Sequence, residues 1–145
     1  YVDGDYLGDK LHLEEVGNVA SRVSTNGEAR RVLTEKMRAV GEDGGVVMEG
    51  RDVGTVVFPD AEMKFYLDAS AAERAKRRVL QLKAAGEKAD YDQILKLIEE
   101  RDWRDSHRAV SPLKPAEDAV IIDTSKLNLQ QVTDAVLEKI QHYAA

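Results

Sequence analysis

Short apolar runs alternate with segments of helical spacing along most of this chain, and that alternation constrains the fold more than any other feature. The apolar runs, each predicted to be a strand buried on both faces, lie at residues 45–49, 63–68 and 118–123. The helical segments lie at residues 71–85, 91–107 and 128–143. Ser70 and Asn128 are placed to cap two of these helices. Strands separated by helices predict an α/β domain whose parallel sheet binds ligands at the carboxyl ends of its strands.

The first 41 residues are predicted to form a hairpin end followed by two helices. Residues 1–8 hold a turn signal, Asp3-Gly4, between short apolar pieces. Helices are expected over residues 11–23 and 28–41. We find no internal repeat and no linker, so one domain is expected over residues 1–145.

Composition narrows the classes of protein that this chain can represent. Its 145 residues are 43% hydrophobic and 33% charged, and no apolar run approaches the roughly 18 residues of a membrane span. The chain has no cysteine, which excludes disulfides and thiolate sites, and its net charge of −6 argues against general binding of nucleic acid polymers. A cytoplasmic protein without membrane contact is expected. We interpret Tyr1 as a cut end and not a natural start, because the sequence begins with neither a methionine nor a signal peptide.

The segment from Gly50 to Thr55 is the strongest local indication of a binding site. It places Arg51 and Asp52 in a glycine-rich turn after a predicted buried strand, where both side chains can face a ligand. An alternative remains open, because Arg-Asp pairs often form salt bridges that close a loop.

Two groups of arginines could bind an anion. Helical spacing places Arg101, Arg104, Asp105 and Arg108 on one face, as an anion trap or as a ladder of exposed ion pairs. The other group contains Arg74, Lys76, Arg77 and Arg78, with few neighbouring acids, as a phosphate-binding cluster or a solvated basic face.

Other catalytic chemistries find little support in the sequence. His12, His107 and His142 lack the spacing of metal ligands, so no metal ligand is assigned. The serines lack a nucleophile-elbow pattern, and no histidine stands in a triad context, which disfavours a hydrolase.

Three stretches of the chain resemble bacterial cytidylate kinase (CMP/dCMP kinase), a nucleoside monophosphate kinase of the P-loop class. They are MEGRDVGTVVFPDAEMKFYLDASAAERAKRR, IEERDWRDSHRAVSPL and DAVIIDTSKLNLQQV, and the resemblance covers essentially all 145 residues. It implies the fold of that class, with a parallel sheet flanked by helices. It also implies pyrimidine nucleotide chemistry, with CMP or dCMP and ATP as partners.

The resemblance assigns three residues to the cytosine ring: Ser21, Arg30 and Asp52. The assignment makes chemical sense, because a carboxylate can accept from the 4-amino group while a guanidinium donates to O2 or N3. Uracil would present an acceptor to Asp52. A kinase for UMP or thymidylate is therefore the more distant alternative.

Further residues match the rest of the substrate. Arg51 and Arg108 match arginines that hold the monophosphate, and Arg101 and Asp105 match residues at the sugar.

The resemblance also implies a lid over residues 70–108. Arginines of the family's lid close over the phosphates during transfer, and Arg74, Arg77 and Arg78 are the catalytic candidates. The remaining divisions implied are 1–44 for the end of the CMP-binding region, 45–69 for core strands and the GRD turn, and 109–145 for the last strand and helix. One small departure is His12-Leu13-Glu14, where the family usually carries an "R-T-E" type start.

A larger departure is that the printed sequence contains no G-x-x-x-x-G-K-[ST] loop, which cradles the donor phosphates in this class. The family carries that loop, with its strand and helix, before the part that matches Tyr1. We therefore interpret the chain as the carboxyl-terminal two thirds of such a kinase, inactive alone, with Mg²⁺ arriving with ATP only in the complete enzyme. The alternative is a non-catalytic CMP-binding fragment or pseudo-kinase.

The loop's strand lies, in the family, between those that match residues 46–49 and 63–68. Its loss should leave two strand edges unpaired. We therefore expect self-association, or pairing with the missing amino-terminal segment.

Overall fold

A computed structural model describes residues 4–6, 8, 11 and 14–143 of the chain. The first two helices are α1 (Glu14–Val23) and α2 (Gly27–Val40), and the π-helical turn η2 (Val53–Val57) follows them. The rest of the order is β1 (Phe65–Asp68), α3 (Ala71–Ala84), α4 (Tyr91–His107), β2 (Val120–Asp123) and α5 (Leu129–Tyr143). Where the structure describes them, the five predicted helices are present with bounds close to those expected. The hairpin predicted at residues 1–8 and the start of the first helix fall largely outside the described residues.

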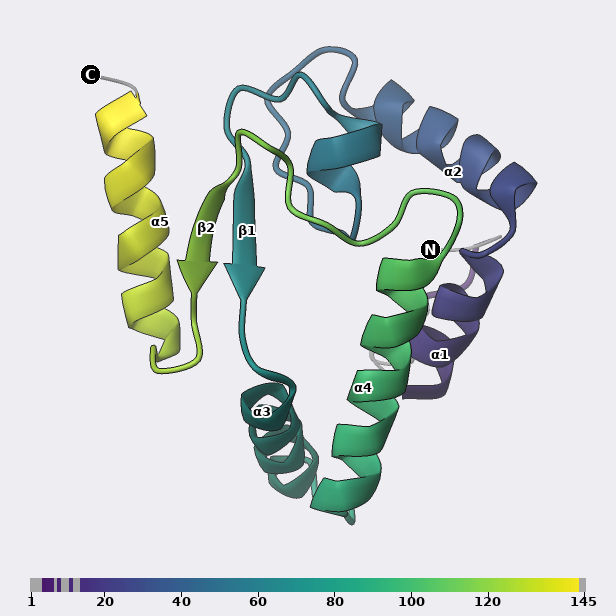
Figure 1. Ribbon diagram of the computed structural model, residues 1–145, viewed down its shortest axis with the longest axis vertical. Helices are drawn as coiled ribbons and strands as arrows, with labels where there is room; N and C mark the ends of the chain where they lie inside the picture. The colour runs from purple at the N-terminus through teal and green to yellow at the C-terminus, as the bar shows by residue number, and fades with distance from the viewer. Residues whose placement is uncertain (1–3, 7, 9–10, 12–13, 144–145) are drawn as a thin grey trace.

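The two strands pair in parallel, which confirms the predicted α/β class with a parallel sheet. Phe65 aligns with Val120 and Asp68 with Asp123. Helices α3 and α4 lie between β1 and β2 in the chain, as a parallel crossover requires. In Figure 1, α5 lies beside β2, and α1, α2 and α4 lie on the opposite side of the sheet, beyond β1.

The prediction of a strand at residues 45–49 was wrong. The backbone there is irregular and belongs to no sheet, and Val47 is fully exposed. Apolar content alone does not make a strand, because the backbone also needs a neighbouring strand for its N–H and C=O groups. In the described part of the chain, only β1 and β2 pair, and they pair with each other.

The predicted burial of both strand faces was also wrong. Leu67 in β1 is 54% exposed and Ile121 in β2 is 62% exposed. Among the described residues, the buried hydrophobic ones are Val57, Ala69 and Ala75. The buried polar ones are more numerous: Ser21, Arg30, Thr34, Asp52, Asp105, Arg108 and Thr124.

Both predicted N-caps are confirmed. The Ser70 hydroxyl accepts from the Glu73 amide at 3.2 Å. The Asn128 side chain accepts from the Gln131 amide, and the Gln131 side chain accepts from the Asn128 amide, both at 2.9 Å. This reciprocal pair is a capping box, so local sequence fixes where these helices begin.

Helix packing brings together the elements that carry the polar residues. Helix α1 packs against α4, α3 packs against α4, and α2 packs against η2 (Figure 1). No helix among the described residues is long and apolar enough to cross a membrane.

Candidate functional site

The GRD segment forms a bend that continues into η2, and not the simple glycine-rich turn that the sequence suggested. A side chain at Gly50 would meet Val53 at 2.7 Å, so the close approach here requires glycine. The Arg38 guanidinium of α2 donates to the Val56 carbonyl at 2.6 Å and to the Val57 carbonyl at 3.0 Å. These bonds tie the end of η2 to α2, which fixes the position of the bend.

Asp52 is buried at the bend and pairs with arginines from two other elements. The Arg30 guanidinium of α2 donates to Asp52 Oδ2, and both side chains are buried. Arg108 Nη2 lies 3.8 Å from Asp52 Oδ1. Arg30 and Asp52 are too far apart in the sequence for its local pattern to indicate their contact. The family resemblance assigns both residues to the cytosine ring.

A second buried carboxylate, Asp105 of α4, organises the adjoining part of the site. Its Oδ1 accepts from the Ser21 hydroxyl at 2.8 Å. Its Oδ2 lies 3.6 Å from Arg51 Nε and 3.7 Å from Arg101 Nε. The Arg104 guanidinium donates to the Ser21 hydroxyl oxygen at 3.0 Å. Asp105 is only 2% exposed, so the interpretation of this face as a ladder of exposed ion pairs is wrong.

Arg108 departs from the predicted helical face, because α4 ends at His107 and Arg108 is its extended C-cap. Its Nε donates to the Ser111 carbonyl at 2.6 Å, and Ser111 adopts a left-handed backbone with φ of 52°. The chain reversal after α4 therefore turns Arg108 toward Asp52 and away from the helix surface.

We call this group the polar cluster: Ser21, Arg30, Arg51, Asp52, Arg101, Arg104, Asp105 and Arg108. Its five guanidiniums exceed its two carboxylates, within a chain whose net charge is −6. Three buried nitrogen atoms of the cluster have no hydrogen-bond acceptor: Arg30 Nε, Arg101 Nε and Arg108 Nη2. Buried donors without acceptors are costly, and an anionic or acceptor-bearing ligand would satisfy them.

The surroundings of Arg108 act on its pKa in both directions. Burial first, and then the neighbouring Arg30 guanidinium, lowers the pKa of Arg108, against the raising effect of Asp52 and Asp105. An anion bound beside Arg108 would oppose this effect and stabilise its charged form.

A cavity of about 270 Å³ between α3 and α4 adjoins the polar cluster. It is lined by Arg51, Arg74, Arg77, Arg78, Gln81, Ile98, Arg101 and Asp102. Arg51 and Arg101 belong to both the cavity and the cluster, so the two basic groups predicted separately meet in one region.

In the described conformation, Arg74 and Arg77 of the lid candidates both bond to protein groups. Arg74 donates through both terminal nitrogens to Asp102 of α4, and through Nε to the Ala69 carbonyl at 3.0 Å. Arg77 donates to the carbonyl and hydroxyl oxygens of Thr124. The sequence offered this group too few neighbouring acids for full pairing, and the acid that pairs with Arg74, Asp102, comes from a different helix. Arg78 lines the cavity.

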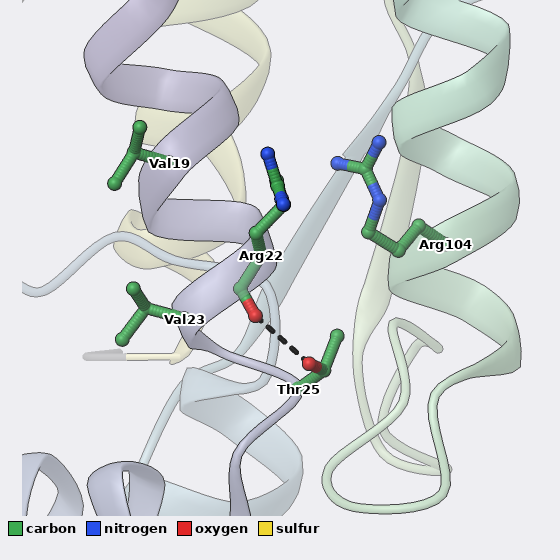
Figure 2. Close-up of a pocket in the computed structure, with 5 residues that line it drawn as sticks. All are labelled: Val19, Arg22, Val23, Thr25 and Arg104. Atoms are coloured by element: carbon green, nitrogen blue, oxygen red, sulfur yellow. Dashed lines mark hydrogen bonds between the residues drawn. The ribbon is translucent and has the colours of Figure 1, made fainter.

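A second, larger cavity of about 540 Å³ lies between α1 and α4 (Figure 2). Val19, Arg22, Val23, Thr25 and Arg104 line it. Figure 2 shows Arg104 reaching from α4 toward the side of α1 that carries Arg22. The Thr25 hydroxyl donates to the Arg22 carbonyl at 2.8 Å, so its proton is used in a local hydrogen bond at the carboxyl end of α1.

The described residues do not fit a resident metal ion. No group of three His, Asp or Glu side chains among them is close enough to hold one. The carboxylates of the cluster and the adjoining cavity are each engaged by arginine.

Fold and site together define an α/β protein with a buried, arginine-rich site suited to an anionic ligand that also bears hydrogen-bonding groups. Residues 1–142 match the family model for cytidylate kinase. The chain is 44% identical over 142 residues to the cytidylate kinase of Pasteurella multocida, covering 98% of this chain and 63% of that protein. It is 46% identical over 139 residues to the cytidylate kinase of Syntrophotalea carbinolica, covering 96% of this chain and 59% of that protein. The chain belongs to the cytidylate kinase family.

The chain thus spans about three fifths of the length of the curated relatives that it matches. A third relative, the cytidylate kinase of Salmonella typhimurium, is 44% identical and is covered to the same extent, 60%.

Proposed function

We propose that the polar cluster is the nucleoside monophosphate site of a kinase that transfers the γ-phosphate of ATP to CMP or dCMP. The observation that carries this proposal is the buried Arg30–Asp52 pair, bordered by arginine nitrogens that have no acceptor. Paired side chains at the base of an arginine-rich site offer both an acceptor and donors to a flat heterocycle whose substituent is anionic.

Cytosine fits that pair of side chains better than uracil. The Asp52 carboxylate, paired with Arg30, offers hydrogen-bond acceptors, which suits the 4-amino group of cytosine. Arg30 Nε has no acceptor in the described chain and can donate to N3 or O2. Uracil would place its O4 acceptor against a carboxylate, an arrangement that leaves two acceptors facing each other.

The remaining cluster residues suit the phosphate and the sugar. Arg51, half exposed, and Arg108, buried with an unsatisfied Nη2, can hold the monophosphate by bidentate contacts. Asp105 Oδ2 and Arg101 can meet the sugar hydroxyls. Arg74, Arg77 and Arg78 remain the candidates for closing over the transferring phosphoryl group. In that role, Arg74 and Arg77 would give up their present contacts with Asp102 and Thr124.

We propose further that these 145 residues do not catalyse transfer alone. The printed sequence contains no G-x-x-x-x-G-K-[ST] loop for the donor phosphates, and the described residues do not fit a resident Mg²⁺. ATP and its Mg²⁺ would be bound by parts of a complete kinase that this sequence does not print.

The competing proposal is a module that captures CMP without catalysis. It is favoured by the same two observations, a nearly complete acceptor-substrate site and no printed phosphate loop. A kinase assay on a longer polypeptide that contains this chain separates the two, because only the first proposal predicts turnover there.

Titration calorimetry with CMP, UMP and cytidine tests the site itself. We expect CMP to bind more tightly than UMP, because of Asp52, and more tightly than cytidine, because of Arg51 and Arg108. Equal affinity for CMP and UMP would remove the cytosine assignment, and equal affinity for CMP and cytidine would remove the phosphate assignment.

A further inference from the structure

Two neighbours of opposite hydrogen-bonding character fix the direction of the Ser21 hydroxyl. A hydroxyl has one proton to donate and two lone pairs to accept with. Asp105 Oδ1, 2.8 Å away, can only accept from it, and Arg104 Nη1, 3.0 Å away, can only donate to it. The proton therefore points to Asp105 and one lone pair faces Arg104. One lone pair of the Ser21 hydroxyl remains for a ligand, so Ser21 can only accept a hydrogen bond from that ligand.

We propose that Arg104 is a specificity-determining positioning residue, which holds Ser21 as an acceptor so that the site selects an exocyclic amine over a carbonyl. This inference rests on the proposed function, in which Ser21 and Asp52 face the pyrimidine. A 4-amino group carries two N–H donors, and two acceptors of fixed direction can take one each. A carbonyl at the same ring position finds no donor from either residue.

Asp105 alone is a weaker hold on the hydroxyl than the pair is. Its other oxygen faces Arg51 and Arg101, and on the proposed function it also meets the sugar. Because Asp105 also interacts with these groups, its hydrogen bond from Ser21 can break when a ligand enters. Arg104 makes no ion pair in the described chain, and its contact with Ser21 is its one hydrogen bond there. With Arg104 removed, the hydroxyl can rotate and donate to a carbonyl, as free hydroxyls do.

A purely structural role for Arg104 makes a different prediction. Arg104 joins α4 to α1 through Ser21, so losing it could simply loosen the site. Loosening would weaken CMP and UMP together and leave their ratio unchanged. The ratio of the two dissociation constants therefore separates positioning from support.

The experiment measures dissociation constants for CMP and UMP by calorimetry on the 145-residue chain and five variants: Arg104→Met, Arg104→Lys, Arg22→Met, Ser21→Ala, and Ser21→Ala combined with Arg104→Met. We expect Arg104→Met to lower the preference for CMP about three- to tenfold, the size of one neutral hydrogen bond. Arg104→Lys, which can only donate, should keep most of the preference. Arg22→Met is the matched control, because it removes a positive charge from the same cavity without a bond to Ser21. In the Ser21→Ala background, Arg104→Met should change the ratio no further.

An unchanged ratio in Arg104→Met overturns the proposal, as does an equal fall in Arg22→Met or a further fall in the Ser21→Ala background. Wild-type chain that binds CMP and UMP equally overturns the cytosine assignment itself, which is a different result from a wild-type preference that Arg104→Met leaves intact. Far-UV circular dichroism checks that each variant folds. If Arg104→Met does not fold, Arg104→Gln serves in its place, because its amide can also accept and should relax the preference in the same direction.

Discussion

The polar cluster and the two-stranded sheet differ in how far their side chains are buried and paired. In the cluster, five of the eight residues are buried, and each carboxylate is paired with at least one arginine from another element. In the sheet, each strand has four residues, with Leu67 and Ile121 exposed, and the neighbouring helix α5 has no buried residue.

The difference follows from the forces that hold each region. Ion pairs and hydrogen bonds are short-ranged and directional, so the cluster is complete once α1, α2, the GRD bend and α4 meet. An apolar face is stabilised only when another layer removes it from water, and the described chain does not supply that layer for the strands. The side chains of the polar cluster are thus better buried and paired than the apolar side chains of the sheet. Each prediction below tests one of these two regions.

The largest effect should be on catalysis. On the proposed function, the chain holds the CMP site and prints no loop for the donor phosphates, so it should give no ATP-dependent conversion of CMP to CDP above background. Joining the chain to the portion of the Pasteurella multocida relative that it does not cover should raise the rate on the order of a thousandfold or more. A coupled assay of ADP release measures both. Steady turnover by the 145-residue chain, purified free of host kinase, would overturn the proposed division of labour.

The second effect concerns the open sheet. Exposed apolar strands with unpaired edges favour self-association, so we expect the chain to be oligomeric or to melt without a sharp transition. The same joined protein should be compact and melt cooperatively, since burying a side chain such as Leu67 or Ile121 contributes about 1.5–3 kcal/mol. Sedimentation and thermal melting provide the comparison. A strictly monomeric chain with a sharp two-state melt would contradict this expectation.

The third effect is on the stability of the cluster. Arg30→Met should destabilise the fold by about 3–5 kcal/mol, because the buried Asp52 carboxylate loses its hydrogen-bonded partner and keeps only Arg108, at 3.8 Å. Arg31→Met is the matched control on the same helix, since Arg31 pairs with Glu28 and Glu35 on the surface and its loss should destabilise the fold much less. Denaturant unfolding of the joined protein measures both changes. Equal changes would mean that the cluster is no more tightly built than the surface.

Sequence reasoning succeeded where the determinants are local. Ser70 and Asn128 cap their helices with groups three residues away, so pattern alone could place α3 and α5. The segment at residues 45–49 was misjudged because a strand depends on a partner that local sequence does not contain.

The candidate site divides in the same way. The resemblance named seven residues for the substrate, and the structure brings all of them into the polar cluster, although their roles remain proposals. The contact of Arg74 with Asp102 and that of Arg104 with Ser21 join separate helices. No periodicity within one helix signals such contacts, and they depend on how the helices pack.

The fourth effect is on specificity. Asp52→Asn should lower the ratio of kcat/KM for CMP to that for UMP roughly ten- to hundredfold, because an amide can present a donor or an acceptor to the ring. Kinetics on the joined protein supply the ratio. An unchanged ratio would make Asp52 a structural partner of Arg30 only.

The smallest effect should come from an ion pair at the edge of the sheet. Lys64 Nζ lies 2.6 Å from Asp118 Oδ2, and this hydrogen bond lowers the pKa of Asp118 from its ordinary value of 3.8. Because the folded-state pKa lies below the unfolded one, the pair stabilises the fold above the unfolded pKa, and this contribution is lost as the pH falls through the folded pKa. Asp118→Asn should therefore lower the melting temperature slightly near neutral pH and have no effect once the pH is well below the folded-state pKa. The neighbouring Glu117→Gln is the control, since Glu117 makes no ion pair in the described chain. Melting curves of the joined protein between about pH 6 and pH 2 test the expectation. A difference from wild type that persists at the acid end would mean that Asp118 acts through something other than its charge. Because the Asp118 carboxylate is exposed to solvent, the effect of Asp118→Asn on stability should be much smaller than that of Arg30→Met. Both variants can be measured on the joined protein, so the buried cluster and the edge of the sheet can be compared directly.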